Sequence, residues 1–461
     1  MSTRAFHVVV LIISIFGAAY GEDAQTSVNI EVIPNQNAAK ISIIFANPVD
    51  NKLEFIESYA GFSGLRNRVS EMRCWDTANV ESACEAASVA KMEYKISLVP
   101  NSDLMASAHI SWLYKEKSLL MLNDLLPGAM FKQFRTRVGF ELPQGWQVEA
   151  AEPKQGGLYL VEDIANAVFL AYKTGEVRVL EGDGGNGVIA LDGEWRFKDQ
   201  TAKEFSGEII AYYSKLFRTP PKKNPSIFVL NFPGEIVRNR WRAETRGSNV
   251  TIISSGATFP SQDEQRLHEQ LRHELFHLWI PGRLGLAGDY AWFYEGFGSY
   301  MALKTGVALE RIRFVDFLNV LSQAYSMEQR RINTPALAES SASSLIYVRG
   351  ILAGFATDVE ITNASDGKRD IANLFRNLLE KFGDGKTSAE AKPALLDIFG
   401  EFPELSFIVE RNIKTGNRFD LKRELGLAGI EFVNGEFTTR KKLSKRQKEI
   451  LGDLGYNKRR S

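Results

Sequence analysis

Apolar residues in the first part of the chain follow a pattern typical of strands. From Ser27 to about Trp195 they form short alternating or continuous stretches, such as those beginning at Val28 and Lys40. Alternation with a period of two is typical of half-buried strands, and short continuous runs are typical of fully buried ones. The glycine-rich segment 182–187 lacks the spacing of a phosphate-binding loop, so we interpret it as a hairpin turn. The pattern predicts an all-β sandwich or a saddle-shaped sheet.

After Glu204 the spacing of apolar residues lengthens toward 3.6, which is the helical period. Strands are predicted at Ile227–Phe232 and around Val250. Helices are predicted at Glu204–Phe217, 263–279, from Ala291 onward, 343–361, 369–382 and 388–399. A small sheet followed by many helices, placed after a β-rich half, indicates an α+β protein.

The chain has 461 residues, which is long enough for two or three domains. Arg4 precedes an apolar run from Val8 to Tyr20, which is shorter than the ~20 residues of a membrane-spanning helix. We interpret it as a cleaved signal peptide, with an uncleaved anchor as the alternative, and expect a secreted or periplasmic protein without stable membrane insertion. The predicted divisions are a signal peptide at 1–21, a β-rich domain at 22–195, a mostly helical domain at 196–415 and a C-terminal extension at 416–461.

The charge balance excludes a general attraction to nucleic acid. The chain has 56 Lys and Arg against 56 Asp and Glu, and 44% of its residues are hydrophobic, as in globular proteins. The last segment, 440–461, is the exception, with nine basic residues against two acidic ones. We interpret it as a solvated tail, with contact to anionic lipid or another polyanion as the alternative.

The chain has two cysteines, Cys74 and Cys84. They are close enough in sequence to bridge a loop, and export to an oxidising compartment would favour the disulfide. Two thiols ten residues apart, with no histidine nearby, do not complete a zinc site. We therefore expect a disulfide and not a metal site.

Residues 273 to 277 read His-Glu-Leu-Phe-His, a motif with metal chemistry. Positions i and i+4 of a helix share a face, so His273 and His277 can hold one zinc ion at Zn–N distances of about 2.0–2.1 Å. Glu274 lies one step around the helix, where its carboxylate can reach a water in the open coordination position. Glu295 supplies the expected third ligand.

The alternative is that the two histidines only line a buried helix. His268 lies five residues before the pair and off its face, and Arg272 stands where a partner at i+4 would be. We interpret His268 as a surface residue.

These motifs resemble the gluzincin zinc metallopeptidases. Three segments are similar to segments of the aminopeptidase N-like enzymes and the PDZ-bearing glycyl aminopeptidases: Trp-Phe-Tyr-Glu-Gly-Phe around Glu295, His277-Leu-Trp, and residues 346–359. The resemblance covers roughly residues 200 to 430. The resemblance implies a thermolysin-like, mostly helical catalytic domain with zinc as cofactor and a peptide or protein as substrate. It also implies that Glu295 is a zinc ligand and that Tyr347 stabilises the oxyanion of the reaction.

The sequence departs from both families in three places. The interval from His277 to Glu295 is short, so the connecting loop 280–290 must be compact, and no PDZ-sized segment follows the helices. Both families carry a glycine-rich Gly-x-x-Glu strand whose glutamate holds the substrate's free amine. Here Glu244 follows Arg242-Ala, without those glycines. Glu244 is either that substrate-binding residue or the partner of Arg242 or Arg246 in a salt bridge.

The residues and the resemblance together predict a zinc-dependent peptidase, with aminopeptidase action favoured over internal cleavage. One alternative is a catalytically silent zinc- or peptide-binding protein. Another is a hydrolase of a different bond, such as an epoxide, because one scaffold can host several reactions. The sequence leaves the oligomeric state and the side-chain preference at the cleaved bond open.

Overall fold

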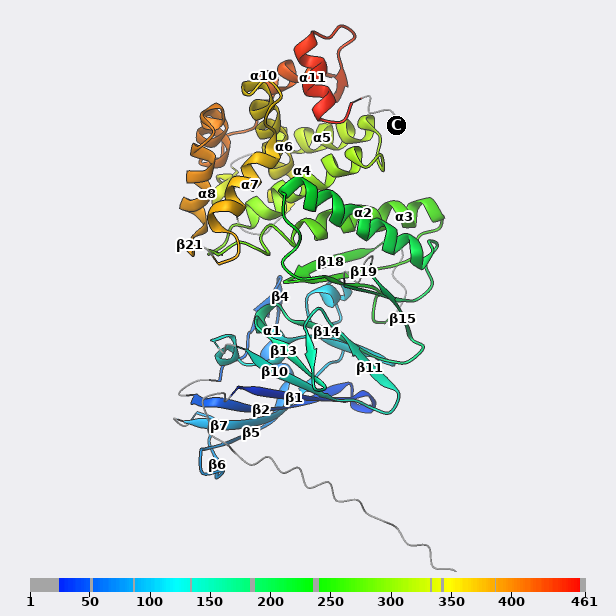
Figure 1. Cartoon of the computed structure of the whole chain (residues 1–461), viewed down its shortest axis with the longest axis vertical. Coiled ribbons are helices and arrows are strands. Elements are labelled where there is room, and N and C mark those ends of the chain that lie inside the picture. Colours follow the sequence, from blue (N-terminus) through cyan, green and yellow to red (C-terminus); the bar gives the residue numbers. More distant parts are fainter. Residues whose placement is uncertain are drawn as a thin grey trace, which may run out of the picture.

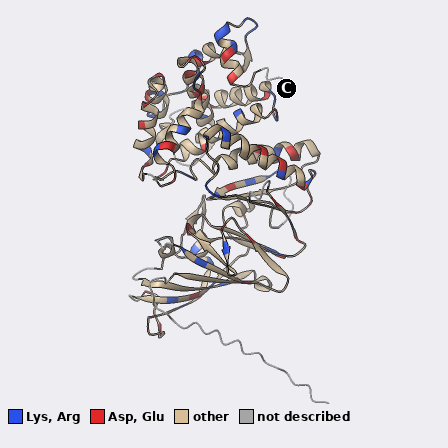
Figure 2. Cartoon of the chain, in the orientation of Figure 1, with Lys and Arg blue, Asp and Glu red and all other residues tan. Residues whose placement is uncertain are grey.

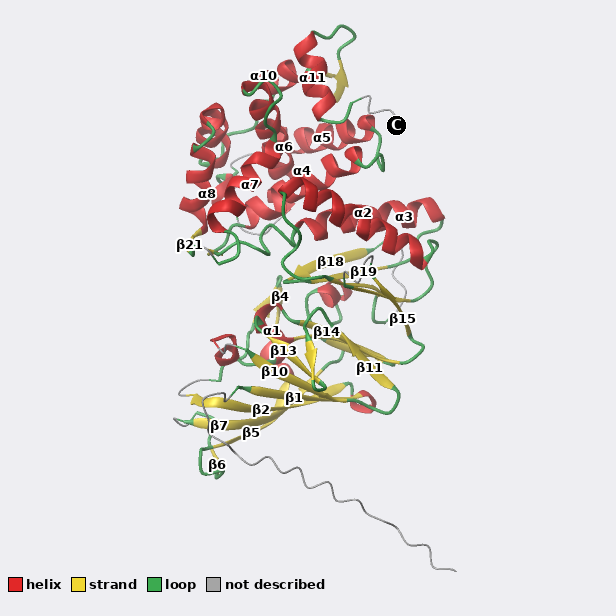
Figure 3. Cartoon of the chain, viewed as in Figure 1, coloured by secondary structure: helices red, strands yellow, loops and turns green. Residues whose placement is uncertain are grey.

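The computed structural model of the chain describes residues 25–49, 53–85, 88–132, 135–182, 187–234, 240–331, 334–340, 344–385 and 387–456. The strands of the first half form one end of the elongated molecule and the helices of the second half form the other (Figure 1). Strands give way to helices along the chain (Figure 3), which confirms the predicted α+β class. The predicted signal peptide and most of the glycine cluster lie outside the described residues.

The outermost layer is an eight-stranded sheet in which β1 pairs with β10 in parallel and with β2 in antiparallel fashion. Val28, Ile30 and Val32 alternate into its core, as the period-two pattern predicted. In spatial order its strands are β12 (Lys154–Gln155), β13 (Leu158–Val161), β10 (Thr136–Glu141), β1 (Ser27–Ile33), β2 (Ala38–Val49), β7 (Val89–Ser97), β5 (Val69–Trp75) and β6 (Glu81–Ser82).

The second layer is a four-stranded sheet that is buried on both faces. Leu120 and Phe169 pack into the core of the eight-stranded sheet, whereas Leu119 and Leu170 pack toward the next sheet. This double burial explains why these strands appear in the sequence as continuous apolar runs. The order is β11 (Trp146–Glu149), β14 (Val168–Lys173), β9 (Lys117–Met121) and β8 (Trp112–Tyr114).

The third layer is a five-stranded sheet between the β-rich half and the helices. Phe228 and Leu230 face the four-stranded sheet, and Ile227 and Val229 face the helices. The order is β15 (Val177–Glu181), β16 (Val188–Asp192), β17 (Ser226–Asn231), β19 (Asn249–Ser254) and β18 (Trp241–Arg246). Strands β15 and β16 precede residue 196 and belong to this sheet.

Helices cover the free face of this sheet and continue away from it. Helix α2 (Asp199–Phe217) connects the parallel strands β16 and β17, and it packs beside α3 (Pro260–Phe276) over the sheet (Figure 1). The others are α4 (Ala291–Ala308), α5 (Phe314–Gln329), α6 (Ser344–Ala364), α7 (Ile371–Phe382), α8 (Ala391–Gly400), α10 (Lys422–Ala428) and α11 (Lys445–Asp453), with single turns at α1 (Leu122–Leu125) and α9 (Ser406–Ile408). The predicted helices are present, with ends shifted by a few residues.

The basic C-terminal segment is folded as far as residue 456, so its interpretation as a solvated tail was wrong for that part. A hairpin of β22 (Ile430–Val433) and β23 (Glu436–Thr439) precedes α11, and Ile450 and Leu451 of α11 are buried. Arg446 donates hydrogen bonds to the carbonyls of Thr362 and Asn363 at the end of α6. The count of basic residues concealed the apolar face that docks this helix.

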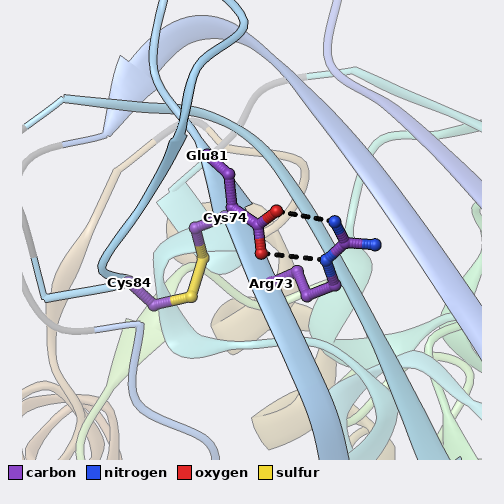
Figure 4. Close-up of a disulfide and its surroundings, with 4 residues drawn as sticks. All are labelled: Arg73, Cys74, Glu81 and Cys84. Atoms are coloured by element: carbon purple, nitrogen blue, oxygen red, sulfur yellow. Dashed lines mark hydrogen bonds and ion pairs between the residues drawn. A yellow bond between two sulfur atoms is a disulfide. The ribbon is translucent and has the colours of Figure 1, made fainter.

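Cys74 and Cys84 form a disulfide that joins β5 to the residues after β6 (Figure 4). Beside it, Arg73 donates hydrogen bonds from Nε and Nη2 to the Glu81 carboxylate, at 2.9 and 2.6 Å. The covalent link and the ion pair close the same short loop. Across the molecule, basic and acidic residues are interspersed over both halves (Figure 2). Within the described residues, every helix is too short or too polar to cross a membrane.

Candidate metal centre

The two histidines of the motif lie at the C-terminal end of α3. Leu267, Leu271 and Leu275 anchor this helix in the core, and His277 directly follows its last residue. The imidazole Nε2 atoms of His273 and His277 are 3.2 Å apart. His277 Nδ1 lies 2.9 Å from the carbonyl oxygen of Ile280, and because a carbonyl only accepts, Nδ1 carries the proton. In the neutral imidazole the lone pair of Nε2 therefore faces the other two candidate donors.

Glu295 comes from the first turns of α4 and completes the group. Its Oε2 lies 3.0 Å from His273 Nε2 and its Oε1 lies 3.7 Å from His277 Nε2. One ligand atom from each of the three residues lies within 4.8 Å of the others. The loop between the histidines and α4 is held by β20 (Leu286–Ala287), which pairs in parallel with β21 (Ala389–Glu390).

The donor set fits a zinc ion in spacing and charge. A tetrahedral ion with Zn–N bonds of about 2.0–2.1 Å needs donors about 3.3 Å apart, close to the separations observed. Burial would raise the pKa of Glu295, but the two imidazoles hold the pKa well below its usual range. Burial would likewise lower the pKa of His277, but the Glu295 carboxylate raises it to about 9. The pocket therefore favours positive charge between these three residues, which a divalent cation can supply.

Glu274 is buried beside the three donors and is held by strand β18. Thr245 Oγ1 lies 2.8 Å from Glu274 Oε2 and 2.9 Å from its backbone carbonyl oxygen, so the hydroxyl can donate to either. Burial raises the pKa of Glu274, and the neighbouring carboxylate of Glu295 acts in the same direction. The sequence reasoning missed Thr245, because only the pairing of β18 with the sheet brings it to α3.

Tyr347 lies on α6, and its ring centroid is 6.3 Å from that of His273. Its side chain is 41% exposed. Burial of the remainder, followed by the charge of Glu295, raises the pKa of Tyr347 well above its usual value. The phenol therefore stays protonated at neutral pH and can act as a hydrogen-bond donor.

A glycine pair brings the helix of Glu295 and the helix of Tyr347 together. A Cβ atom added at Gly350 would lie 2.1 Å from the Cα of Gly296, so α4 and α6 are in contact backbone to backbone. Gly296 directly follows Glu295, and Gly350 lies about one helical turn after Tyr347. This close crossing places the third candidate ligand and the tyrosine on the same side of the metal centre.

Glu244, on β18, is engaged by three side chains. It accepts hydrogen bonds from the Tyr59 hydroxyl at 2.5 Å and from His109 Nδ1 at 2.9 Å, and Arg246 Nε lies 3.1 Å from its Oε1. The structure thus shows the salt bridge with Arg246 that the sequence left open, and Arg242 is exposed. Tyr59 and His109 come from the β-rich half, and no sequence signal marked them.

The interpretation of His268 as a surface residue was wrong. Its side chain is buried, its ring meets Phe205 of α2 edge-on, and Arg272 donates to its Nδ1 at 2.6 Å. Glu208 of α2 lies 3.7 Å from its Nε2. Burial, followed by the positive charges of Arg272 and Arg311, lowers the pKa of His268 to about 3. The packing of α2 on this face of α3 is a tertiary contact that helical periodicity alone did not show.

No protein-family profile matches the sequence, and no curated protein matches it in a sequence search. Solved structures do match its fold. An aminopeptidase N family protein from Idiomarina loihiensis superposes with a TM-score of 0.70 at 13% identity, over 88% of this chain and 78% of that one. An M1 zinc metallopeptidase from Deinococcus radiodurans, bound to a Tyr-Ser-Ala substrate, superposes with a TM-score of 0.55 at 14% identity, over 87% and 96%. The chain therefore has the fold of these M1 zinc metallopeptidases, as the resemblance of its motifs predicted.

Proposed function

We propose that this protein is a zinc-dependent peptidase. The observation that carries the proposal is the convergence of His273, His277 and Glu295 from two helices, with Glu274 buried beside them and outside the donor set. A structural zinc site would be expected to have four protein ligands, whereas a catalytic site has three and keeps one position open. The M1 zinc metallopeptidase of Deinococcus radiodurans is described with a tripeptide substrate, which supports peptides as the substrate class here.

A zinc ion bound there would supply Lewis acidity, which polarises a carbonyl and makes a water molecule more acidic. Glu274 accepts the proton of the attacking water and delivers it to the leaving amine. Thr245 holds the Glu274 carboxylate in one orientation by its hydrogen bond. Tyr347 donates its hydroxyl proton in a hydrogen bond to the oxyanion that forms at the former carbonyl oxygen.

The strand beside the metal centre offers a place for an extended peptide. Strand β18 lies at the edge of the five-stranded sheet, and its Thr245 contacts Glu274. An edge strand presents backbone N–H and C=O groups that can pair with the backbone of a substrate. A peptide bound along β18 would bring one of its carbonyl groups to the metal centre.

Aminopeptidase action is the form of peptidase that the resemblance implies, and the Idiomarina loihiensis protein carries that family name. It requires a group that recognises the free amine of the substrate, and Glu244 is the candidate. Whether the protein cleaves only next to a free amino terminus, or also cleaves peptides without one, depends on the surroundings of this carboxylate.

We also propose that the protein acts in an oxidising compartment, outside the cell or in the periplasm. The disulfide between Cys74 and Cys84 supports this location, because such bonds persist where thiols are not kept reduced. Retention of the disulfide in protein recovered from the medium or periplasm, measured by mass spectrometry, tests it.

Peptide hydrolysis by the zinc-loaded protein tests the proposed function. Glu274→Gln should keep zinc and lower kcat by about 10²–10⁴, the usual contribution of a general acid–base group. Glu269→Gln, an exposed substitution on the same helix, should leave both unchanged. A chelator should abolish turnover. Undiminished hydrolysis by Glu274→Gln, or a zinc-loaded wild type that cuts no peptide, would contradict the proposal.

A further inference from the structure

The Glu244 carboxylate is already engaged by three side chains. An ionised carboxylate offers about four lone-pair positions. Tyr59 and His109 each take one, and Arg246 lies 3.1 Å from Oε1. Tyr59 belongs to the hairpin of β3 (Ser58–Tyr59) and β4 (Phe62–Ser63), and His109 follows a short turn in the β-rich half. The carboxylate thus links β18 to two separate segments of that half.

The charge of Glu244 is also compensated. The Arg246 side chain is 3% exposed, and its guanidinium carries a permanent positive charge. Arg246 donates to the carbonyl oxygen of His109 at 2.8 Å, and its Cζ lies 4.2 Å from the centre of the Tyr59 ring. The guanidinium is therefore held in place, and the ion pair leaves no net negative charge for a substrate cation.

This compensated pair lies next to the metal centre. Thr245, between Glu244 and Arg246 on β18, contacts Glu274. Tyr294 packs edge-on against the imidazole of His277 with ring centroids 5.7 Å apart. A substrate bound at the metal centre would meet the pair on the β18 side.

We infer that this peptidase does not select for a free α-amine. The substrate group that lies beside Glu244 is a neutral nitrogen, as in acylated peptides or internal peptide segments, because Arg246 already compensates the charge of the carboxylate. An ammonium group buried beside a satisfied ion pair would lose its hydration without gaining a counter-charge. An amide N–H needs only one acceptor, which a lone pair not taken by Tyr59 or His109 can provide. The inference rests on the proposed function for its substrate class and makes Arg246 the residue that determines specificity.

The first test compares one peptide in two forms, with its amino terminus free and acetylated. The zinc-loaded wild-type protein should hydrolyse both with kcat/KM values that differ by less than about threefold. A preference of a hundredfold or more for the free form would overturn the inference.

Variants on β18 test whether charge compensation by Arg246 determines the preference between the free and the acetylated peptide. Arg246→Gln exposes the charge of Glu244 and should raise the ratio of free to acetylated kcat/KM about tenfold, and an unchanged ratio in a folded variant would count against the inference. Glu244→Gln should leave the ratio within threefold of the wild type, whereas a large loss for the free peptide alone would show that Glu244 reads the amine. Arg242→Gln removes an exposed arginine from the same strand and should leave the ratio of free to acetylated kcat/KM unchanged. If Arg246→Gln does not fold, Glu244→Gln decides.

Binding measurements distinguish a failure of this inference from a failure of the peptidase proposal. Calorimetry with zinc-loaded Glu274→Gln should give equal Kd values for the free and acetylated peptides. Equal binding without turnover in the wild type would contradict the peptidase proposal and support the inference. Tenfold tighter binding of the free peptide would overturn the inference and leave the peptidase proposal intact, and no binding of either peptide at millimolar concentration would overturn both.

Discussion

The metal centre and the Glu244 cluster contain the same kinds of side chain and differ in what compensates them. The metal centre joins two imidazoles and two carboxylates, and none of its described contacts comes from Lys or Arg. The Glu244 cluster joins a carboxylate and an imidazole with a buried arginine and a tyrosine donor. The first arrangement calls for an external cation, whereas the second is complete without one. A buried acidic residue therefore indicates a binding site only when its partners leave its charge unbalanced.

Two histidines, one on α3 and one directly after it, also differ in the charge that surrounds them. The Glu295 carboxylate raises the pKa of His277 to about 9, whereas burial near Arg272 lowers the pKa of His268 to about 3. His268 lies on α3, His277 directly follows its last residue, and both side chains are buried. Their roles follow from the charge that faces them, with His277 suited to a cation and His268 to a neutral core.

Among variants that keep Glu274 and the three candidate ligands, the largest effect is expected at Tyr347, and it tests whether the candidate metal centre is catalytic. Tyr347→Phe removes the hydroxyl and should lower kcat by about 10²–10³, equivalent to roughly 2.7–4 kcal/mol of lost oxyanion stabilisation. Zinc content and KM should change little. Steady-state kinetics with metal analysis checks this, and a Tyr347→Phe protein with normal kcat would remove the tyrosine from the mechanism.

The close crossing of α4 and α6 should be the next most sensitive feature. Gly350→Ala places a methyl group against the backbone of Gly296 and should destabilise the protein by about 1–3 kcal/mol through overpacking. It should also lower activity, because Glu295 and Tyr347 move apart. Gly400→Ala, at the end of α8 where a Cβ meets nothing within 4 Å, is the control. Equal stabilities of the two variants in urea unfolding would show that the crossing is not tightly packed.

The buried His268 should make stability depend on pH. The folded protein keeps His268 neutral to about pH 3, whereas the unfolded chain protonates it near pH 6.5. Its stabilising contribution is therefore complete above pH 6.5 and decreases as the pH falls toward 3. Between pH 7.5 and 5 the loss should be about 2 kcal/mol. Urea unfolding of the wild type and His268→Gln at both pH values measures it, and an identical pH dependence in the two proteins would contradict the assignment.

The smallest effect is expected at Thr245, which lies between the two compared regions. Thr245→Val removes the hydroxyl that contacts Glu274 and keeps the shape, so kcat/KM should fall about tenfold, as for loss of a hydrogen bond to a charged group. Thr245→Ser keeps the hydroxyl and should stay near the wild-type value. Equal losses in both variants would show that Thr245 matters for packing alone.

The grouping of His273, His277 and Glu295 was predictable from the sequence because the information is local. The i, i+4 spacing places His273 and His277 on the same face, and the nearby sequence around Glu295 resembles a known motif. Of the Glu244 cluster only the ion pair with Arg246 was open to prediction, because the partners Tyr59 and His109 lie 185 and 135 residues away in the chain. Only the pairing of β18 with the sheet and the packing of the β-rich half bring these groups together.

The predicted α+β order was accurate for a similar reason. Period-two and period-3.6 patterns report which face of an element is buried, so the α+β order followed from them. They do not report which element covers that face. The burial of His268 by α2 and the docking of α11 on the helical half were therefore missed.

Zinc binding to the purified protein tests the central claim most directly. The wild type should bind one zinc ion per chain, and Glu295→Ala and His277→Ala should weaken that binding by at least about a hundredfold, because each removes one of three ligands. Glu244→Gln should bind zinc as the wild type does. Full zinc binding by Glu295→Ala and His277→Ala, or its loss in Glu244→Gln, would contradict the distinction between the two regions.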